Sequence, residues 1–176
     1  MIYYKQIDID SFDIIQTKTL EFINSRGQPK IGFSVLPMKE YTEYCPEILT
    51  AFSRYNIKPV SCALYTTTEQ EQSRVHVDYI LDNMPQCRIN IPILNCEGSR
   101  TEFYTGGEYD VYTQPNGIPY LEIKKDSVAT KVDEVEITVP TIIRVQKPHR
   151  VNSNLVRVPR ICMTVRCDVD PVFLLE

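Results

Sequence analysis

The two histidines of this chain lie 73 positions apart, and the first stands two residues before an aspartate. They are His76, in the stretch Val-His-Val-Asp78, and His149. Side chains two positions apart in a strand point to the same face of a sheet, so His76 and Asp78 would project side by side. A second imidazole brought across a β-barrel would complete two histidines and one carboxylate on one face of a metal ion. That is the ligand set of non-haem Fe(II) oxygenases.

Three protein ligands leave coordination positions open for O2 and for a chelating cosubstrate. Zinc could bind the same residues, because geometry and metal availability select the ion as much as affinity does. A chance His-x-Asp is common in a chain of this size. The tripeptide is therefore weighed together with the rest of the sequence, and two incidental histidines remain an alternative.

The amino-acid composition is that of an ordinary globular protein. The 176 residues suit one domain, and 43% of them are hydrophobic and 24% charged. The net charge of −4, without a run of Lys or Arg, makes nucleic acid the least favoured partner. No signal-peptide core and no membrane-length apolar run is found, so we expect a cytoplasmic protein that does not enter a membrane. Oligomeric state is not readable from these features.

The six cysteines form no Cys-x-x-Cys pair, which argues against zinc binding through sulfur. In a reducing compartment they are expected to be small buried hydrophobic side chains. They are Cys45, Cys62, Cys87, Cys96, Cys162 and Cys167.

The first 57 residues show helical periodicity. A helix capped by Asp10 or Ser11 is expected to run to about Ile23 and to stop at Gly27. A second, short helix is expected to start near Cys45-Pro46. Its predicted buried residues are Ile48, Leu49 and Phe52.

From Pro59 onward the period becomes that of strands. The predicted strands after the one that ends at Thr67 are 75–79, 87–94, 101–105, 109–113, 120–124, 134–139, 142–146 and 160–168, with a turn at 114–117. Two helices followed by about eight strands predict an α+β, mainly β fold. We expect a β-sandwich or jelly-roll barrel over residues 58–170, with supporting helices in 1–57 and one domain over 1–176.

Arg160 opens the last predicted strand, eleven positions after His149. Alternation places Arg160, Cys162, Thr164 and Arg166 on one face of that strand and apolar residues on the other. A buried arginine requires an anionic partner, and its planar guanidinium fits a carboxylate. Arg88 and Asn90 likewise share one face of the strand 87–94 and suggest a lined cavity. A solvent-exposed outer face is the alternative for both pairs.

The order His76-x-Asp78, His149 and then Arg160 resembles the 2-oxoglutarate- and Fe(II)-dependent dioxygenases. The resemblance covers roughly Tyr65 to Asp168. It implies a double-stranded β-helix fold, an iron triad of His76, Asp78 and His149, and pairing of Arg160 with the distal carboxylate of 2-oxoglutarate. The implied reaction is O2-dependent hydroxylation of an amino acid, a peptide side chain or a small metabolite.

Three further likenesses concern the cosubstrate. The stretch Arg88-Ile-Asn90-Ile-Pro resembles the Arg-x-His-x-Pro segment of the aspartyl/asparaginyl β-hydroxylase branch, with Asn90 in place of the histidine. Tyr65 lies about where prolyl hydroxylases have a tyrosine that binds the cosubstrate. Arg160 and Arg166 resemble the arginine pair of the nucleic-acid demethylase branch, although the Asn-x-Tyr signature of that branch is absent from this sequence.

Two rival functions are kept. A cupin-like metalloprotein would use the same triad without 2-oxoglutarate, and its metal binding would not depend on Arg160. A non-catalytic jelly-roll interaction protein would bind no stoichiometric metal. Fold alone does not decide among the three.

Overall fold

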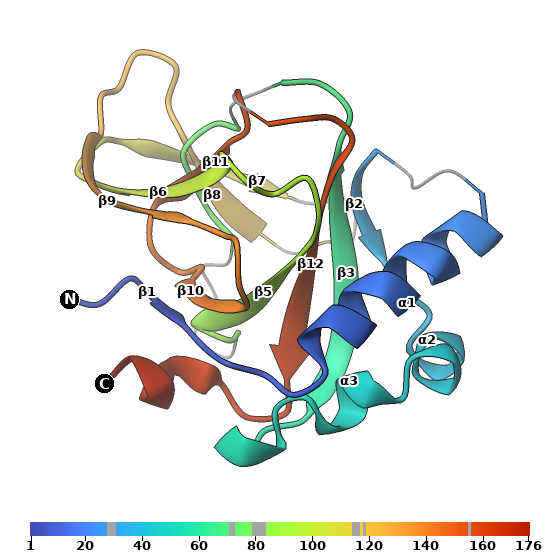
Figure 1. Ribbon diagram of the computed structural model, residues 1–176. Coiled ribbons are helices and arrows are strands. Elements are labelled where there is room, and N and C mark those ends of the chain that lie inside the picture. Colours follow the sequence, from blue (N-terminus) through green and yellow to red (C-terminus); the bar gives the residue numbers. More distant parts are fainter. Residues whose placement is uncertain (28–30, 71–72, 79–83, 114–116, 118, 155) are drawn as a thin grey trace.

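The protein folds into two antiparallel sheets with helices packed on one of them (Figure 1). The computed structural model describes residues 1–27, 31–70, 73–78, 84–113, 117, 119–154 and 156–176. The end of the predicted strand at Tyr79 and most of the predicted turn at 114–117 lie outside these residues. None of the helices in the described part of the chain is long and apolar enough to span a membrane.

The major sheet has the strand order β1-β10-β5-β12-β3-β2. Its strands are β1 (Tyr4–Gln6), β2 (Gly32–Val35), β3 (Pro59–Thr67), β5 (Cys87–Leu94), β10 (Thr141–Arg144) and β12 (Arg160–Cys167). The minor sheet has the order β7-β8-β4-β11-β6-β9. Its strands are β4 (His76–Val77), β6 (Arg100–Thr105), β7 (Tyr109–Thr113), β8 (Pro119–Ile123), β9 (Thr130–Glu136) and β11 (His149–Asn152).

The strand order identifies the predicted double-stranded β-helix. The four central strands of the major sheet, in the order β3-β12-β5-β10, occupy the same positions as β4-β11-β6-β9 in the minor sheet. The chain passes between strands of equal position, from β3 to β4, β5 to β6, β9 to β10 and β11 to β12. Such repeated crossing between two antiparallel sheets is the jelly-roll arrangement. It places residues that are distant in sequence on facing inner surfaces.

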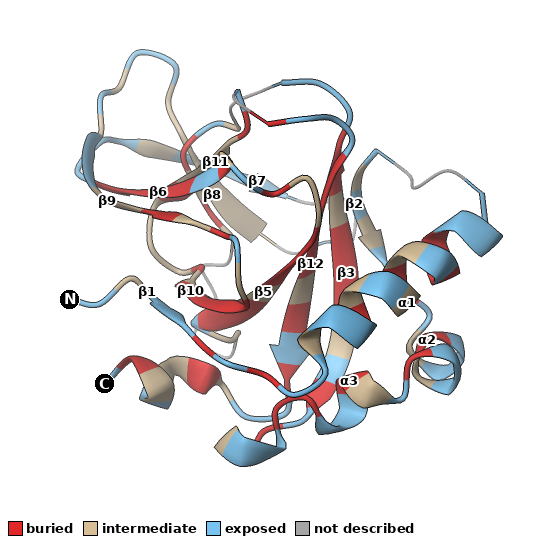
Figure 2. Cartoon of the chain, in the orientation of Figure 1, coloured by how far each residue is buried: buried red, intermediate tan, exposed pale blue. Residues whose placement is uncertain are grey.

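The helices cover the outer face of the major sheet. They are α1 (Phe12–Ser25), α2 (Met38–Tyr44), α3 (Glu47–Thr50) and the short 3-10 helices η1 (Ser53–Tyr55) and η2 (Pro171–Leu175). Along β12, Ile161, Met163 and Val165 pack into the cluster shared with these helices. Cys162 instead joins the cluster between the two sheets, with Phe103 and Ile143. Figure 2 shows the resulting buried run through β3, β5 and β12.

Several local expectations require correction. Ser11 adopts a left-handed conformation (φ 58°) before α1, and its side chain makes no capping hydrogen bond. Leu49 is 47% exposed, because α3 has a single turn that directs Ile48 inward instead. Residues 1–57 are not only helical, since they also supply β1 and β2 to the edges of the major sheet. The strand expected at 75–79 is reduced to His76–Val77.

The cysteine expectation is confirmed. All six cysteines are free and buried. Cys45, Cys62, Cys87 and Cys167 lie in the helix-facing cluster, and Cys96 and Cys162 lie in the inner one. Each acts as a small apolar side chain in a closely packed interior.

Ile89 tests the packing between the major sheet and the helices. It is fully buried at the centre of β5. We expect Ile89→Ala to lower the free energy of unfolding by about 3 kcal/mol, because apolar contact is lost and a cavity remains. Urea denaturation measures this, with Val128→Ala as the control at a side chain that is 85% exposed. Equal effects of the two substitutions would contradict this description of the core.

Candidate metal centre

The jelly-roll topology brings His76, Asp78 and His149 together. His76 on β4 is the direct cross-strand partner of His149 on β11, and their ring centroids are 4.5 Å apart. Asp78 follows β4, and its backbone N–H donates to the carbonyl of Val145 at 3.0 Å. One ligand atom from each of the three residues lies within 4.8 Å of the others. The three side chains therefore have the spacing of a metal-binding group.

Backbone hydrogen bonds fix which ring nitrogen each histidine presents. Nδ1 of His76 lies 2.8 Å from the carbonyl oxygen of Arg74, and Nδ1 of His149 lies 2.8 Å from that of Lys147. A carbonyl oxygen only accepts, so in both rings Nδ1 carries the proton. Both Nε2 atoms then face Oδ1 of Asp78, at 3.3 Å from His76 and 3.6 Å from His149. Hydrogen bonds of this kind orient histidine ligands in metal proteins.

The pKa values of the two imidazoles are shifted in opposite directions. The pKa of His149 is lowered to about 4, because burial and the nearby His76 outweigh the attraction of Asp78. Burial also lowers the pKa of His76, but the hydrogen bond and charge of Asp78 outweigh it, so that pKa is raised overall. For Asp78, burial raises the pKa, while His76, His149 and Arg88 together hold it below its ordinary value.

This arrangement suits a cation. At neutral pH, His149 presents a lone pair at Nε2 to a carboxylate oxygen, and neither atom carries a hydrogen to share. Without an ion, a proton on His76 would offset the negative charge of Asp78, but only on the side of the carboxylate that faces His76. A divalent metal would accept electron pairs from all three atoms at once. Two neutral imidazoles and one carboxylate suit Fe(II), and Zn(II) accepts the same donors.

Arg160 provides a second unusual feature, on the inner face of the major sheet, whereas the triad lies on the minor sheet. It shares the face of β12 with Cys162 and is only 2% exposed. Its Nε and Nη1 atoms have no hydrogen-bond partner among the described residues. Burying a guanidinium without a full set of hydrogen bonds lowers stability by roughly several kcal/mol. Binding of an anion beside it would offset that cost.

Thr67 lies beside Arg160 and was not singled out by the sequence. It is the cross-strand partner of Arg160 on β3, so both side chains point to the inner face. Its hydroxyl is buried and also has no hydrogen-bond partner among the described residues. A threonine in a strand is too common to signal a site, and only the register with β12 reveals this one.

The other residues implied by the resemblance have different settings. Arg88 is buried and close enough to Asp78 to lower the pKa of that carboxyl. Asn90 is half-buried on the same face, opposite Thr164 of β12. Tyr65 is half-buried opposite Cys162 on the inner face. Arg166 is exposed and lies at the opposite end of β12 from Arg160. Cosubstrate contacts for these four residues stay predictions.

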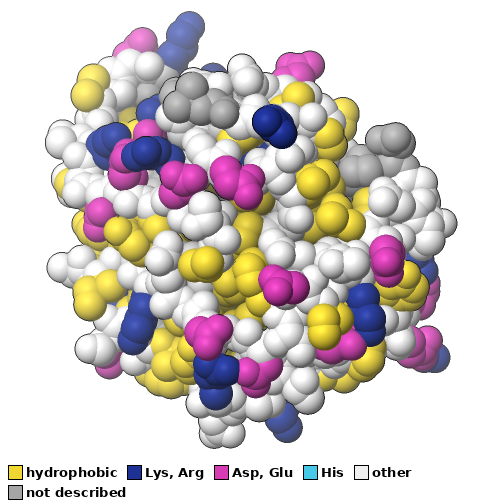
Figure 3. Space-filling model, in the orientation of Figure 1, with side chains coloured by type: hydrophobic (Ala, Val, Ile, Leu, Met, Phe, Trp, Pro, Cys, Tyr) yellow, Lys and Arg dark blue, Asp and Glu magenta, His cyan; other side chains and the backbone are white. Residues whose placement is uncertain are grey.

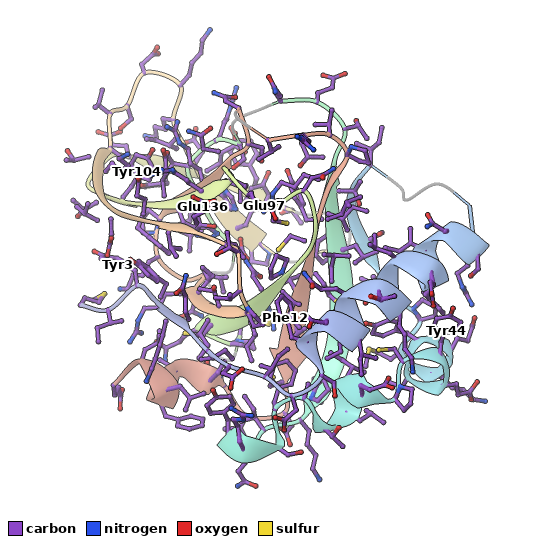
Figure 4. All side chains as sticks on the ribbon, viewed as in Figure 1. Tyr3, Phe12, Tyr44, Glu97, Tyr104 and Glu136 are labelled. Atoms are coloured by element: carbon purple, nitrogen blue, oxygen red, sulfur yellow. The ribbon has the colours of Figure 1, made fainter. Side chains whose placement is uncertain are left out.

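A buried carboxylate network braces β11 behind the metal centre, and sequence reasoning did not find it. Glu102 on β6 pairs with Arg150 of β11 and accepts hydrogen bonds of 2.6 Å from Arg150 Nε and from the Tyr104 hydroxyl. Burial raises the pKa of Glu102, but these donors lower it overall. Figure 4 labels Tyr104 on the side of the molecule opposite Tyr44 of α2. On the other face of β11, Phe103 lies 6.4 Å from the His149 ring.

Comparisons with known proteins add a likeness to solved structures. No protein-family profile and no curated protein sequence matches this chain. Among solved structures, the chain is similar to a Pseudomonas putida prolyl-4-hydroxylase, with a TM-score of 0.49 and 11% sequence identity. The similarity covers 94% of this chain and 93% of that one. The fold assignment given above rests on the strand order of the two sheets.

The two histidines should titrate separately in the metal-free protein. We expect His76 to titrate above its ordinary pKa of 6.5 and His149 near 4. Asp78→Asn should lower the pKa of His76, because the largest of the effects that raise it is removed. Proton NMR of the imidazoles measures both values, with Asp126→Asn as the control at an exposed carboxyl. An unchanged His76 pKa in Asp78→Asn would contradict the proposed pairing.

Proposed function

We propose that this protein is an Fe(II)- and 2-oxoglutarate-dependent dioxygenase that hydroxylates an amino acid, a peptide side chain or a small metabolite. The observation that carries the proposal is the convergence of Nε2 of His76, Nε2 of His149 and a carboxylate oxygen of Asp78. Three ligands of these types on one side of a metal leave positions for O2 and a cosubstrate. The position of Arg160 on the inner face of the major sheet, which faces the minor sheet that carries the triad, supports the proposal.

Each residue has a definite part in this proposal. His76, Asp78 and His149 would hold the metal, with both rings oriented by the carbonyls of Arg74 and Lys147. Bound Fe(II) with 2-oxoglutarate would supply the O2-dependent conversion of a C–H bond to an alcohol, with succinate and CO2 as coproducts.

Arg160 and Thr67 fit the distal carboxylate of 2-oxoglutarate. The guanidinium would neutralise the carboxylate and donate through Nε and Nη1, while the Thr67 hydroxyl would add a third hydrogen bond. This pairing would satisfy three buried polar atoms at once. It supports a dicarboxylate cosubstrate over a cupin-like use of the triad, in which the Arg160 guanidinium would have no assigned partner.

The metal ligands can be tested one by one. His76→Ala and Asp78→Ala should each weaken metal binding at least roughly tenfold and abolish Fe(II)-dependent formation of succinate from 2-oxoglutarate, because one donor is lost. Mn(II) binding followed by electron paramagnetic resonance measures affinity, and mass spectrometry measures succinate. Affinity should also fall as the pH drops through the raised pKa of His76, since the metal must displace that proton. Parent-like metal affinity in both variants would overturn the assigned triad.

The carboxylate site can be tested separately from the metal. Arg160→Ala should weaken 2-oxoglutarate binding to the Mn(II)-loaded protein by about ten- to a hundredfold, as expected for a charge-assisted hydrogen bond of about 1.5–3 kcal/mol. Thr67→Val should weaken it about threefold to tenfold, since a neutral donor is removed. Calorimetry measures both, with Arg157→Ala as the control at an exposed arginine. If Mn(II) binding persists and 2-oxoglutarate affinity does not respond to Arg160→Ala, the cupin-like function is favoured.

A further inference from the structure

Strand β2 is a sheet edge without charged residues. Each sheet has two edge strands, β1 and β2 in the major sheet and β7 and β9 in the minor sheet. β1 contains Lys5, β7 contains Asp110, and β9 contains charged residues at several positions, whereas β2 reads Gly-Phe-Ser-Val. Soluble proteins usually protect an open edge with charge or proline, because its unpaired backbone groups would otherwise recruit another strand. β2 lacks that protection.

The side chains of this edge form an exposed apolar stripe. Ile31, Phe33 and Val35 alternate along the strand and are 73%, 61% and 64% exposed. Phe33 is the direct partner of Tyr65 on β3, so the stripe continues the inner face of the major sheet. We call these three residues the β2 surface. Figure 3 shows hydrophobic side chains gathered over β2.

The backbone of β2 offers hydrogen-bonding groups at the same residues. The N–H of Leu36 donates to the carbonyl of Cys62 on β3 at 2.9 Å. Bonded pairs alternate in an antiparallel ladder, so Ser34 also bonds toward β3, while the N–H and C=O groups of Phe33 and Val35 point to the open edge. Exposed apolar side chains therefore coincide with backbone groups that have no strand partner at this edge among the described residues.

The minor sheet extends past the barrel on the same side. β2 lies beyond β3, and β8 and β7 lie beyond β4, the strand that faces β3 in the barrel. His76 pairs with Glu122 of β8, which places Tyr120 on the His76 face. Tyr120 pairs with Tyr112 of β7, and their rings are 5.7 Å apart. Two tyrosines therefore continue the minor-sheet face that bears the metal centre.

We propose that the β2 surface binds an extended polypeptide as an added strand, and that this polypeptide is the substrate. Its backbone pairs with Phe33 and Val35, and its alternate side chains contact the apolar stripe, as in other cases of strand addition. Its role as substrate rests on the proposed function. The same surface favours a polypeptide over a free amino acid or small metabolite, neither of which carries a repeating series of amides.

A second copy of this chain fits the surface less well. Edge-to-edge pairing of two copies would join strands of only four residues and place their apolar stripes side by side on one sheet face. A stable dimer normally buries about 1,200–2,000 Å². A bound polypeptide can both pair with the edge and lay side chains toward the tyrosines of β7 and β8.

The test uses the metal-free chain of 176 residues, so that its outcome does not depend on iron or turnover. A displayed library of random twelve-residue peptides is selected on the immobilised protein, and enriched peptides are synthesised for affinity measurement. We expect alternating apolar residues among them, and Phe33→Lys or Val35→Lys should weaken their binding at least roughly tenfold. Val111→Lys is the matched control, because Val111 is 62% exposed on the edge strand β7 and points to the opposite face of that sheet.

Amide hydrogen exchange supplies a second readout with residue resolution. In the free protein, the amides of Phe33 and Val35 should exchange fast and that of Ser34 slowly. Peptide binding should slow Phe33 and Val35 by roughly tenfold or more and leave Ser34 little changed. This alternation distinguishes strand addition from adsorption on an apolar patch.

Two results would overturn the proposal. One is the absence of enriched peptides, or peptides whose binding is the same for Val35→Lys and the parent. The other is a dimer in sedimentation equilibrium that Val35→Lys dissociates, which would assign the β2 surface to a second copy. Peptide binding in a protein that forms no succinate would leave the β2 surface standing while the dioxygenase proposal fails.

Discussion

The candidate centre depends on two backbone carbonyls that each accept a hydrogen bond from the Nδ1–H group of a histidine. Once the carbonyls of Arg74 and Lys147 have fixed the rings, both Nε2 atoms must face the carboxylate of Asp78. Three electron-pair donors then lie within 4.8 Å. The jelly-roll register maintains this arrangement by pairing β4 with β11, while the Glu102 network holds β11 from its other side. The pairing of β4 with β11 and the Glu102 network therefore both help to hold the three ligand atoms in position.

The second constraint is the positive charge of Arg160, which lies in a packed interior. A chain that needed only stability would gain from an apolar side chain at this position. Here Nε and Nη1 of Arg160 and the hydroxyl of Thr67 lie on adjacent strands, and these buried atoms have no hydrogen-bond partner in the described part of the chain. An anion of the right shape would offset this cost on binding. Carboxylate selectivity would thus arise from atoms that are unfavourable in the free protein.

The sequence predicts β5 and β12 well, because burial on one or both faces imposes a clear period. β5 has the predicted bounds, and β12 differs by one residue at its end. Helix α1 follows in the same way from its periodic apolar positions. β7 also has the predicted bounds, although four of its five residues are exposed. The prediction for β9 was wrong at both ends, since this strand runs from Thr130 to Glu136 and not over 134–139. β1, β2 and α2 were missed, since strands of three or four residues and a helix of seven show too little of any period.

The candidate site is predictable only in part. His76 and Asp78 are linked by local spacing, and His149 is one of only two histidines, so rarity itself draws attention to it. Thr67 becomes visible only through its pairing with Arg160, which no local pattern encodes. Glu102 was missed for a similar reason, because its partner Arg150 lies 48 positions away in the chain.

The central claim is that one metal ion held by the triad also binds the cosubstrate directly. The most direct measurement is the visible absorption of the anaerobic Fe(II)-loaded protein during titration with 2-oxoglutarate. We predict a weak metal-to-ligand charge-transfer band that saturates at one equivalent of bound cosubstrate, because a keto acid chelated to Fe(II) gives such a band. Stoichiometric Fe(II) binding without the band would contradict the account.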